Sequence, residues 1–179
     1  RSPSDDDLMA RYSTGDMTAF ETLYGRHKDA VYRYFLRQLD SAAAADAMQE
    51  VWSKVVAARK RYRANGRFKS YLFTVAHNVL MDHHRKAMRS VDTSRDTDVE
   101  DQRDPARALQ GERARDRLMG LIKRLPHAQR DVLIMHKESG LTLRAIAEIT
   151  GASEEAVKSR LRYAMDKLKE GMRAHVEAH

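Results

Sequence analysis

The sequence predicts an all-α protein built from two small helical domains that a flexible linker joins. Apolar residues recur at three- and four-residue spacing along most of the chain, and no stretch alternates apolar and polar residues as a strand does. The chain has 179 residues, 42% of them hydrophobic, which is enough for one core or two small ones. The periodicity is lost over residues 91–105, so the helical pattern falls into two blocks.

The first block, residues 5–90, predicts four consecutive helices. We expect them at Asp5–Ser13, Met17–Gln38, 41–60 and Phe68–Met88. The spacing on the third helix predicts a buried stripe of Ala45, Met48, Trp52 and Val55. Residues 61–67 separate the last two helices, and they form a basic and aromatic loop around an Asn-Gly turn signal.

Residues 91–108 are the predicted linker, because they are rich in polar residues that form helices poorly. They carry 3 Lys/Arg and 6 Asp/Glu, whereas residues 1–90 carry 16 and 10, and residues 109–179 carry 14 and 10. Two basic blocks beside an acidic bridge indicate two modules that face nucleic acid. The second module, residues 109–175, is expected to hold about four helices, and Pro126 begins the one that runs to about His136.

Residues 136–165 have the pattern of a helix-turn-helix. A first helix at about Leu143–Thr150 ends at Gly151, a residue suited to the left-handed conformation of a helix end. Ser153 can cap a second helix whose first turn is acidic. The outward face of that helix collects Glu155, Lys158, Ser159, Arg162 and Tyr163. Such a face suits reading of the DNA major groove, although an ordinary helical hairpin with a solvated face has the same pattern.

The stretch 65–86 is the second informative segment. Thr74, Asn78 and Arg85 fall on one outward line of the predicted helix, and Lys69 lies nearby. An amide and a guanidinium on one exposed face can hydrogen-bond an unstacked base and hold its phosphates. The aromatic residues Tyr62 and Phe68 either stack on bases or pack into the core, and aromatic residues at helical spacing favour the core.

The sequence shows no motif for catalysis, for cofactor binding or for metal binding. The sequence contains no cysteine, no phosphate-binding glycine loop and no carboxylates paired for acid–base work. His77, His83 and His84 diverge around their helix and lack a carboxylate cluster, so we expect no metal site. No apolar run approaches the roughly 20 residues of a membrane helix, and we expect neither membrane insertion nor a signal peptide.

Three motifs, in this order, resemble those of the extracytoplasmic-function sigma factors over about Asp7–Gly171. The segment Asp46-Ala-Met-Gln-Glu-Val-Trp52 is similar to the family's Asp-Leu-x-Gln-Glu-Val-Phe. The segment that begins Phe68-Lys-Ser-Tyr-Leu and ends at Asn78 is similar to Phe-x-x-Trp-Leu-x-x-Ile-Ala-x-Asn. The segment Leu125-Pro-His-Ala-Gln-Arg130, followed by the helix-turn-helix, is similar to a promoter-reading domain. A lone helix-turn-helix is common, but the ordered triple is specific.

The resemblance implies a bacterial, cytoplasmic sigma factor that binds core RNA polymerase and directs promoter-specific transcription initiation. Residues 5–90 would be the sigma region 2 domain, which binds polymerase and recognises and melts the −10 element. Residues 109–175 would be the region 4 domain, which reads the −35 element. The implied partners are the clamp of the β′ subunit, the flap of the β subunit, promoter DNA and an anti-sigma factor. The implied protein is not an enzyme and needs no cofactor.

The resemblance also assigns roles to individual residues. Polymerase binding falls on Asp46, Gln49 and Glu50, which by chemistry alone form only a solvated polar face. Recognition of −10 falls on Tyr62, Arg67, Phe68, Lys69, Thr74, Asn78 and Arg85. Recognition of −35 falls on Glu155, Lys158, Ser159, Arg160, Arg162 and Tyr163, with Arg160 directed towards the phosphate backbone.

Some positions depart from the family's pattern. The segment 44–47, Ala-Ala-Asp-Ala, lacks one carboxylate and one apolar anchor, so polymerase binding would rest on fewer polar groups. Tyr71 stands where a Trp is usual, Ala145 where a Glu is usual, and Tyr163 where an Arg is usual. Two alternatives are a sigma-like decoy that sequesters a regulator (an anti-anti-sigma protein) and a plain helix-turn-helix repressor. Decoys normally carry a phosphate-receiver domain, and a repressor leaves residues 1–90 unexplained.

Overall fold

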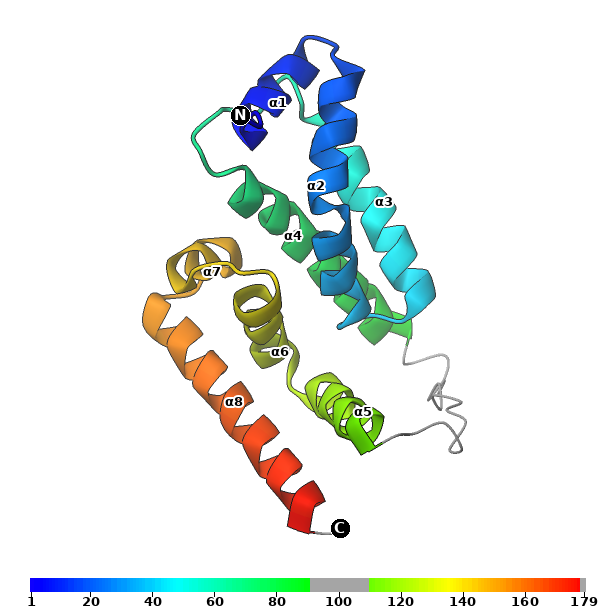
Figure 1. Ribbon diagram of the computed structural model, residues 1–179, viewed down its shortest axis with the longest axis vertical. Coiled ribbons are helices and arrows are strands. Elements are labelled where there is room, and N and C mark those ends of the chain that lie inside the picture. The colour runs from blue at the N-terminus through cyan, green and yellow to red at the C-terminus, as the bar shows by residue number, and fades with distance from the viewer. Residues whose placement is uncertain (91–109, 178–179) are drawn as a thin grey trace.

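The computed structural model describes residues 1–90 and 110–177, which consist of helices and connecting loops without a strand. The first domain holds α1 (Asp5–Ser13), α2 (Met17–Leu36), α3 (Ser41–Ala57) and α4 (Phe68–Ser90). The second holds α5 (Gln110–Arg124), α6 (His127–Leu133), a π-helical turn (Ile134–Glu138), α7 (Leu143–Thr150) and α8 (Glu154–Glu177) (Figure 1). The predicted all-α fold of two helical domains is confirmed. The predicted linker, residues 91–108, lies outside the described residues.

Side-chain caps fix where the helices begin. Ser4 Oγ accepts the N–H of Asp7, and the Asp7 carboxylate accepts the N–H of Ser4, which is a reciprocal capping box. Asp16, Asp40 and Thr142 each accept the backbone N–H three residues further on, at the starts of α2, α3 and α7. Each such cap stabilises a helix by about 1 kcal/mol.

The predicted helix ends differ from the observed ones by a few residues. The helix predicted to run from Pro126 to His136 is α-helical only as far as Leu133. The π-helical turn follows because Ser139 donates its N–H to Ile134 O at 2.9 Å, five residues back. The helices α2 and α3 end earlier than predicted, and α4 continues to Ser90.

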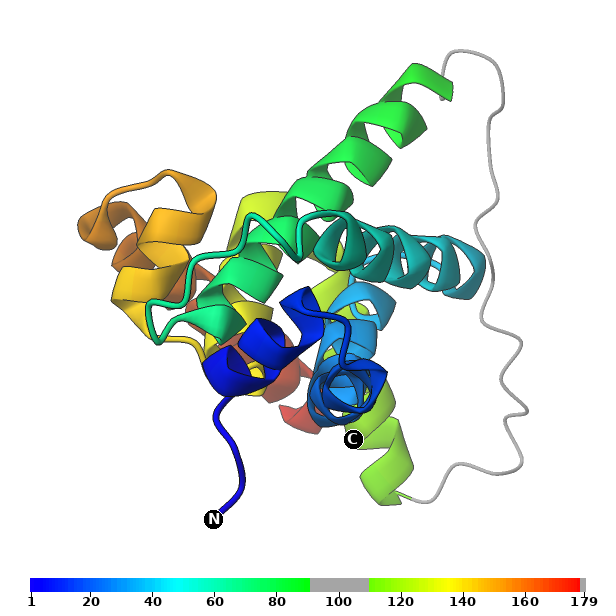
Figure 2. The same cartoon turned by 90° about the horizontal axis from the view of Figure 1, so that it is seen from above.

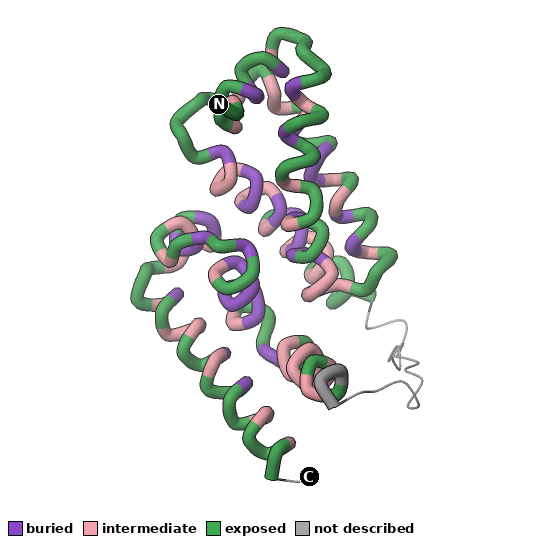
Figure 3. The backbone as a smooth tube through the Cα atoms, viewed as in Figure 1, coloured by how far each residue is buried: buried purple, intermediate pink, exposed green. Residues whose placement is uncertain are grey.

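The core of the first domain lies where α2, α3 and α4 face one another (Figure 3). Its largest members are fully buried side chains, among them Leu23, Val31, Phe35, Val51, Leu72, Phe73 and Leu80. The prediction that Ala45 is buried is wrong, because the inward stripe of α3 runs through Ala44, Ala47, Val51 and Val55. Ala45 is one residue, about 100° of helix rotation, away from that stripe and is exposed.

The two domains pack against each other and share one buried cluster. Val132, Ile134, Met135, Leu141 and Ile146 of the second domain belong to the same cluster as the apolar face of α4. The helix α7 lies against α4, and the π-helical turn lies against α2 (Figures 1 and 2). A smaller cluster of Leu125, Leu133, Ala164 and Leu168 joins α5, α6 and α8.

Gly151 gives a direct test of the turn between α7 and α8. It has φ +70° and donates its N–H to Ala147 O, and a Cβ added there would meet no atom within 4 Å. We expect Gly151→Ala to lower the free energy of unfolding, measured with urea, by about 1–2 kcal/mol from backbone strain alone. The control is Gly25→Ala in α2, where a Cβ also meets no atom and helix propensity favours alanine. Equal changes in the two variants would contradict the role given to Gly151.

Candidate nucleic-acid interface

The turn between α7 and α8 holds the start of α8 at a fixed angle on the surface. Ile146, Ala147 and Ile149 of α7 and Val157 of α8 are buried on the inner side of the turn. Ser153 Oγ accepts the N–H of Ala156 at 3.1 Å and so caps α8. The predicted helix-turn-helix, with its left-handed Gly151, is therefore present.

The predicted −35 residues lie on the outer face of α8, where their side chains make only weak contacts with the rest of the protein. Glu155, Lys158, Arg162 and Tyr163 are exposed, whereas Ser159 and Arg160 are half-buried. Lys158 Nζ lies 3.6 Å from Glu155 Oε1, and the Arg162 guanidinium lies 5.9 Å from the centroid of the Tyr163 ring. Exposed contacts of these kinds are worth about 1 kcal/mol or less, so a ligand can replace them.

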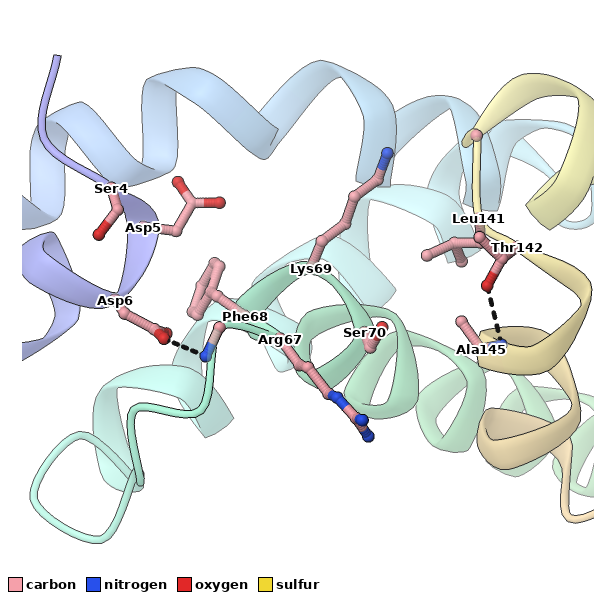
Figure 4. A pocket seen from close by; sticks show the side chains of 12 residues that line it. Ser4, Asp5, Asp6, Arg67, Phe68, Lys69, Ser70, Leu141, Thr142 and Ala145 are labelled. Atoms are coloured by element: carbon pink, nitrogen blue, oxygen red, sulfur yellow. Dashed lines mark hydrogen bonds between the residues drawn. The ribbon is translucent and has the colours of Figure 1, made fainter. Parts of the chain in front are cut away.

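The basic loop before α4 is held by the first turn of α1. Asp6 Oδ1 accepts the hydroxyl of Tyr62 at 2.5 Å, and Asp6 Oδ2 accepts the backbone N–H of Gly66 (Figure 4). Gly66 has φ +76°, and Asn65 Oδ1 accepts the N–H of Arg67 at 3.0 Å. Burial of the Tyr62 hydroxyl and, to a lesser extent, the nearby Asp6 carboxylate raise the pKa of Tyr62 well above its usual value. The hydroxyl therefore remains a hydrogen-bond donor.

The prediction that Phe68 stacks on a base is wrong for this arrangement. Its side chain is 2% exposed and packs against His27, Tyr62 and Tyr71, with ring centroids 5.4, 5.8 and 6.0 Å away. Phe68 occupies the first turn of α4 and belongs to the buried cluster, so the alternative interpretation as a core residue is correct. Tyr62 and Tyr71 are half-buried beside it.

The outer face of α4 keeps only part of the predicted polar line. Asn78 and Arg85 are exposed, and Arg85 Nη2 donates to Asp82, which holds the pKa of that carboxyl below its usual value. Thr74 is half-buried, and its hydroxyl donates to Ser70 O at 2.8 Å, so it is largely occupied within the helix. Lys69 is half-buried near Gly140 of the other domain.

A pocket lies between the α1–α4 junction and the segment that leads into α7 (Figure 4). Asp5, Asp6 and Lys69 line it from the first domain, and Leu141 and Thr142 line it from the second. Beside it the exposed Arg67 Nη1 lies 3.6 Å from Glu148 Oε2 of α7. The second domain therefore covers part of the surface on which the −10 residues were predicted.

A buried carboxylate at the domain interface was not predicted from the sequence. Asp131 of α6 accepts hydrogen bonds from Tyr34 Oη (2.6 Å) and Gln38 Nε2 (3.3 Å) of the first domain, and from His77 Nδ1 of α4 (2.7 Å). We call these four residues the Asp131 cluster. The one signal in the sequence is a charged residue directly before the apolar run 132–135.

The predicted polymerase-binding residues lie on α3. Asp46 and Gln49 are exposed, while Glu50 is half-buried and lies 3.1 Å from His83 Nε2. Gln49 also lines a surface groove with Tyr24, Met48, Trp52, Ser53, Val56 and Ala57. Of the three predicted residues, Gln49 thus borders a largely apolar groove, which the sequence did not indicate.

Residues 1–90 and 110–177 also lack a metal-binding cluster and a membrane-spanning helix. No group of three or more His, Cys, Asp or Glu side chains there is placed to hold a metal ion. No helix in these ranges is both long and apolar enough to cross a membrane.

A helix-turn-helix with a cationic outer face, docked on a helical domain with a basic loop, defines a two-domain DNA-binding regulator. Residues 23–90 match the family described as Sigma-70 region 2, and residues 121–170 match Sigma-70, region 4.

Similar proteins give the same assignment. The chain is 30% identical to RNA polymerase sigma factor CarQ of Myxococcus xanthus over 166 residues, 90% of this chain and 94% of CarQ. It is 27% identical to ECF RNA polymerase sigma factor BldN of Streptomyces coelicolor over 158 residues, 86% of this chain and 60% of BldN. A structure of the sigma factor RpoE with the anti-sigma factor NepR from Bartonella quintana has the same fold, with a TM-score of 0.72 and 22% identity over 86% of this chain and 96% of that one. The chain belongs to the extracytoplasmic-function sigma factors, and it is an alternative sigma factor that directs transcription initiation by core RNA polymerase.

Two stacked histidines at the domain interface give a pH prediction. The rings of His84 and His127 lie 3.8 Å apart, and Arg130 Nη2 lies 2.6 Å from His127 Nδ1. Burial, with His127 and Arg130 nearby, lowers the pKa of His84 from 6.5 to about 4. Because the folded chain favours the neutral ring, this contribution to stability is complete above pH 6.5 and is lost as the pH falls towards 4.

We therefore expect the urea midpoint of the wild type to fall between pH 6.5 and 4, and to fall less in His84→Gln. The control is His83→Gln, one position along α4, where the ring contacts Glu50 instead. If His84→Gln and His83→Gln lose stability in parallel with the wild type over this range, the stacked pair does not carry the pH dependence.

Proposed function

We propose that the outer face of α8 reads the −35 element as duplex DNA, and that the first domain recognises and opens the −10 element. The observation that carries this proposal is that the chain has two exposed cationic surfaces, one on α4 of the first domain and one on α8 of the second. In the second domain, Lys158, Arg162 and Tyr163 are exposed on a helix whose inner face is fixed by buried residues. A helix presented in this way fits the major groove.

For the −10 element, the exposed groups are Asn78, Arg85 and the loop residue Arg67. Asn78 would hydrogen-bond an unstacked base of the non-template strand, and Arg85 and Lys69 would contact phosphates. Tyr62 and the loop backbone would form one wall of the base site, with Phe68 supporting that wall from the core.

We infer that α3 binds the polymerase clamp through Asp46, Gln49 and Glu50, and that the second domain contacts the β flap. The apolar groove beside Gln49 supports this inference, because a groove bordered by exposed polar side chains suits a protein partner. An anti-sigma factor is a further proposed partner, since the structurally similar RpoE was solved with one. The protein would act in the bacterial cytoplasm.

Transcription in vitro with purified core polymerase tests the function as a whole. The template is a promoter that the wild-type holoenzyme selects from a random-sequence duplex library. A sigma factor yields defined transcripts from it, whereas a decoy or a plain repressor yields none.

Arg162→Ala tests −35 recognition. We expect its affinity for the −35 duplex to fall by about 1–3 kcal/mol, and one base preference to relax, because a guanidinium can read a base edge. The control is Arg173→Ala, an exposed arginine two turns or more further along α8. Unchanged affinity and unchanged sequence preference in Arg162→Ala would exclude this role.

Asn78→Ala combined with Arg85→Ala tests −10 recognition. We expect open-complex formation on the selected promoter, followed by permanganate reactivity of thymines, to slow at least tenfold, because a base contact and a phosphate contact are lost. The −35 affinity should not change. A matched double variant, Arg11→Ala with Thr22→Ala, removes a cation and a polar side chain from exposed sites on α1 and α2. Wild-type opening by the Asn78/Arg85 variant would contradict the assignment.

A further inference from the structure

The loop that joins α3 to α4 has little internal support. Residues 58–67 contain turns and bends but no regular element, and the backbone hydrogen bonds within this described loop are those from Arg61 and Tyr62 to Ala58 O. Five of these ten residues are Lys or Arg. Like charges at this density repel one another, so the loop needs an external restraint to hold one conformation.

Asp6 supplies that restraint from another helix. Its two carboxylate oxygens take one bond each, from the Tyr62 hydroxyl at 2.5 Å and from the Gly66 N–H. The two donors stand four residues apart, so one carboxylate closes the loop between them. The Tyr62 ring in turn packs 5.0 Å from that of Tyr71 and 5.8 Å from that of Phe68, which carries the restraint into the first turns of α4.

The helix that carries Asp6 is itself well anchored. Asp5 pairs with Arg26 at 3.2 Å and lies 2.9 Å from His27, both on α2. On the inner side of α1, Leu8, Met9 and Tyr12 are buried. The three consecutive aspartates therefore have separate tasks: Asp5 anchors α1 to α2, Asp6 holds the loop, and Asp7 completes the capping box with Ser4.

We propose that Asp6 is a positioning residue for promoter opening. It holds the loop 61–67 in the conformation in which Gly66 and Arg67 lie at the first turn of α4, beside Lys69 and Ser70. This inference rests on the proposed −10 role of the first domain. Without the Asp6 bonds the loop samples many conformations. Ordering the loop on DNA binding then costs conformational entropy, which lowers the affinity for the opened promoter.

Asp6→Asn is the decisive variant, because an amide has one acceptor oxygen and keeps at most one of the two bonds. Asp7→Asn is the matched control: it makes the same change of charge on the same helical turn, and its amide oxygen can still accept the single bond from the Ser4 N–H. Tyr62→Phe removes one donor and leaves the ring in place. Asp6→Glu retains two acceptor oxygens and is the conservative rescue.

The first readout needs no DNA. Trypsin cleaves after the loop residues Arg61, Arg63 and Arg67, and we expect native-state cleavage there to be several-fold faster in Asp6→Asn than in Asp7→Asn or the wild type. The second readout is open-complex formation by the holoenzyme on the selected promoter. We expect an approximately tenfold slower rate in Asp6→Asn, the typical effect of losing one hydrogen bond to a charged group.

A positioning role predicts that the Asp6 variants lose promoter opening but keep −35 affinity, whereas a general folding defect would lower both. Affinity for the −35 duplex should stay at the wild-type value in every Asp6 variant, Asp6→Glu should recover part of the opening rate, and Tyr62→Phe should add little to Asp6→Asn. Wild-type opening by Asp6→Asn would overturn the inference, and the Asn78/Arg85 variant would still report separately on the proposed −10 role. A joint loss of opening and of −35 affinity, or equal defects in Asp6→Asn and Asp7→Asn, would also overturn it.

Discussion

Asp131 is 2% exposed, and the packing of the two domains is organised around its carboxylate. Removing an ionised carboxylate from water costs several kcal/mol unless hydrogen bonds replace the lost water. Here Tyr34, Gln38 and His77 supply them, and all three belong to the other domain. Tyr34 is itself fully buried, and burial together with Asp131 raises its pKa well above the usual value, so it remains a donor. These three hydrogen bonds exist only while the domains are in contact, and water replaces them when the domains separate.

The rest of the interface consists of apolar contacts and ion pairs. Apolar residues of the π-helical turn and of α7 belong to the buried cluster that the two domains share. At the rim, Arg37 donates from Nε and Nη2 to the two oxygens of Glu138, each at 3.1 Å, and Arg67 pairs with Glu148. The Arg67–Glu148 pair is exposed and adds little energy, whereas the Arg37–Glu138 pair is partly buried and its two parallel bonds fix the register of the domains. One helix, α7, therefore has two roles: it fixes the angle of α8 and it covers part of α4.

Local sequence patterns predicted the elements of each domain well, because caps and periodicity act over a few residues. The bounds of α1 and α7 and the left-handed Gly151 match the prediction. Helical spacing likewise placed Asn78 and Arg162 on exposed faces. What the sequence did not reveal depends on contacts between distant segments. Asp6 and Tyr62 are 56 residues apart and Tyr34 and Asp131 are 97 apart, and no local rule pairs them. The burial of Phe68 was left open for the same reason, because His27 of the distant helix α2 packs against its ring.

The docking of α7 on α4 has a consequence for binding equilibria. Residues 91–109 connect the two domains covalently, so dilution does not separate them as it separates two proteins. Each domain instead experiences the other at an effective concentration that the length of this connection sets. A ligand that needs the covered part of α4 binds only the fraction of molecules in which the domains are apart, and its apparent affinity is its intrinsic affinity multiplied by that fraction. The domain contact thus acts as an intramolecular competitor whose strength is encoded in the chain and does not depend on how much protein is present.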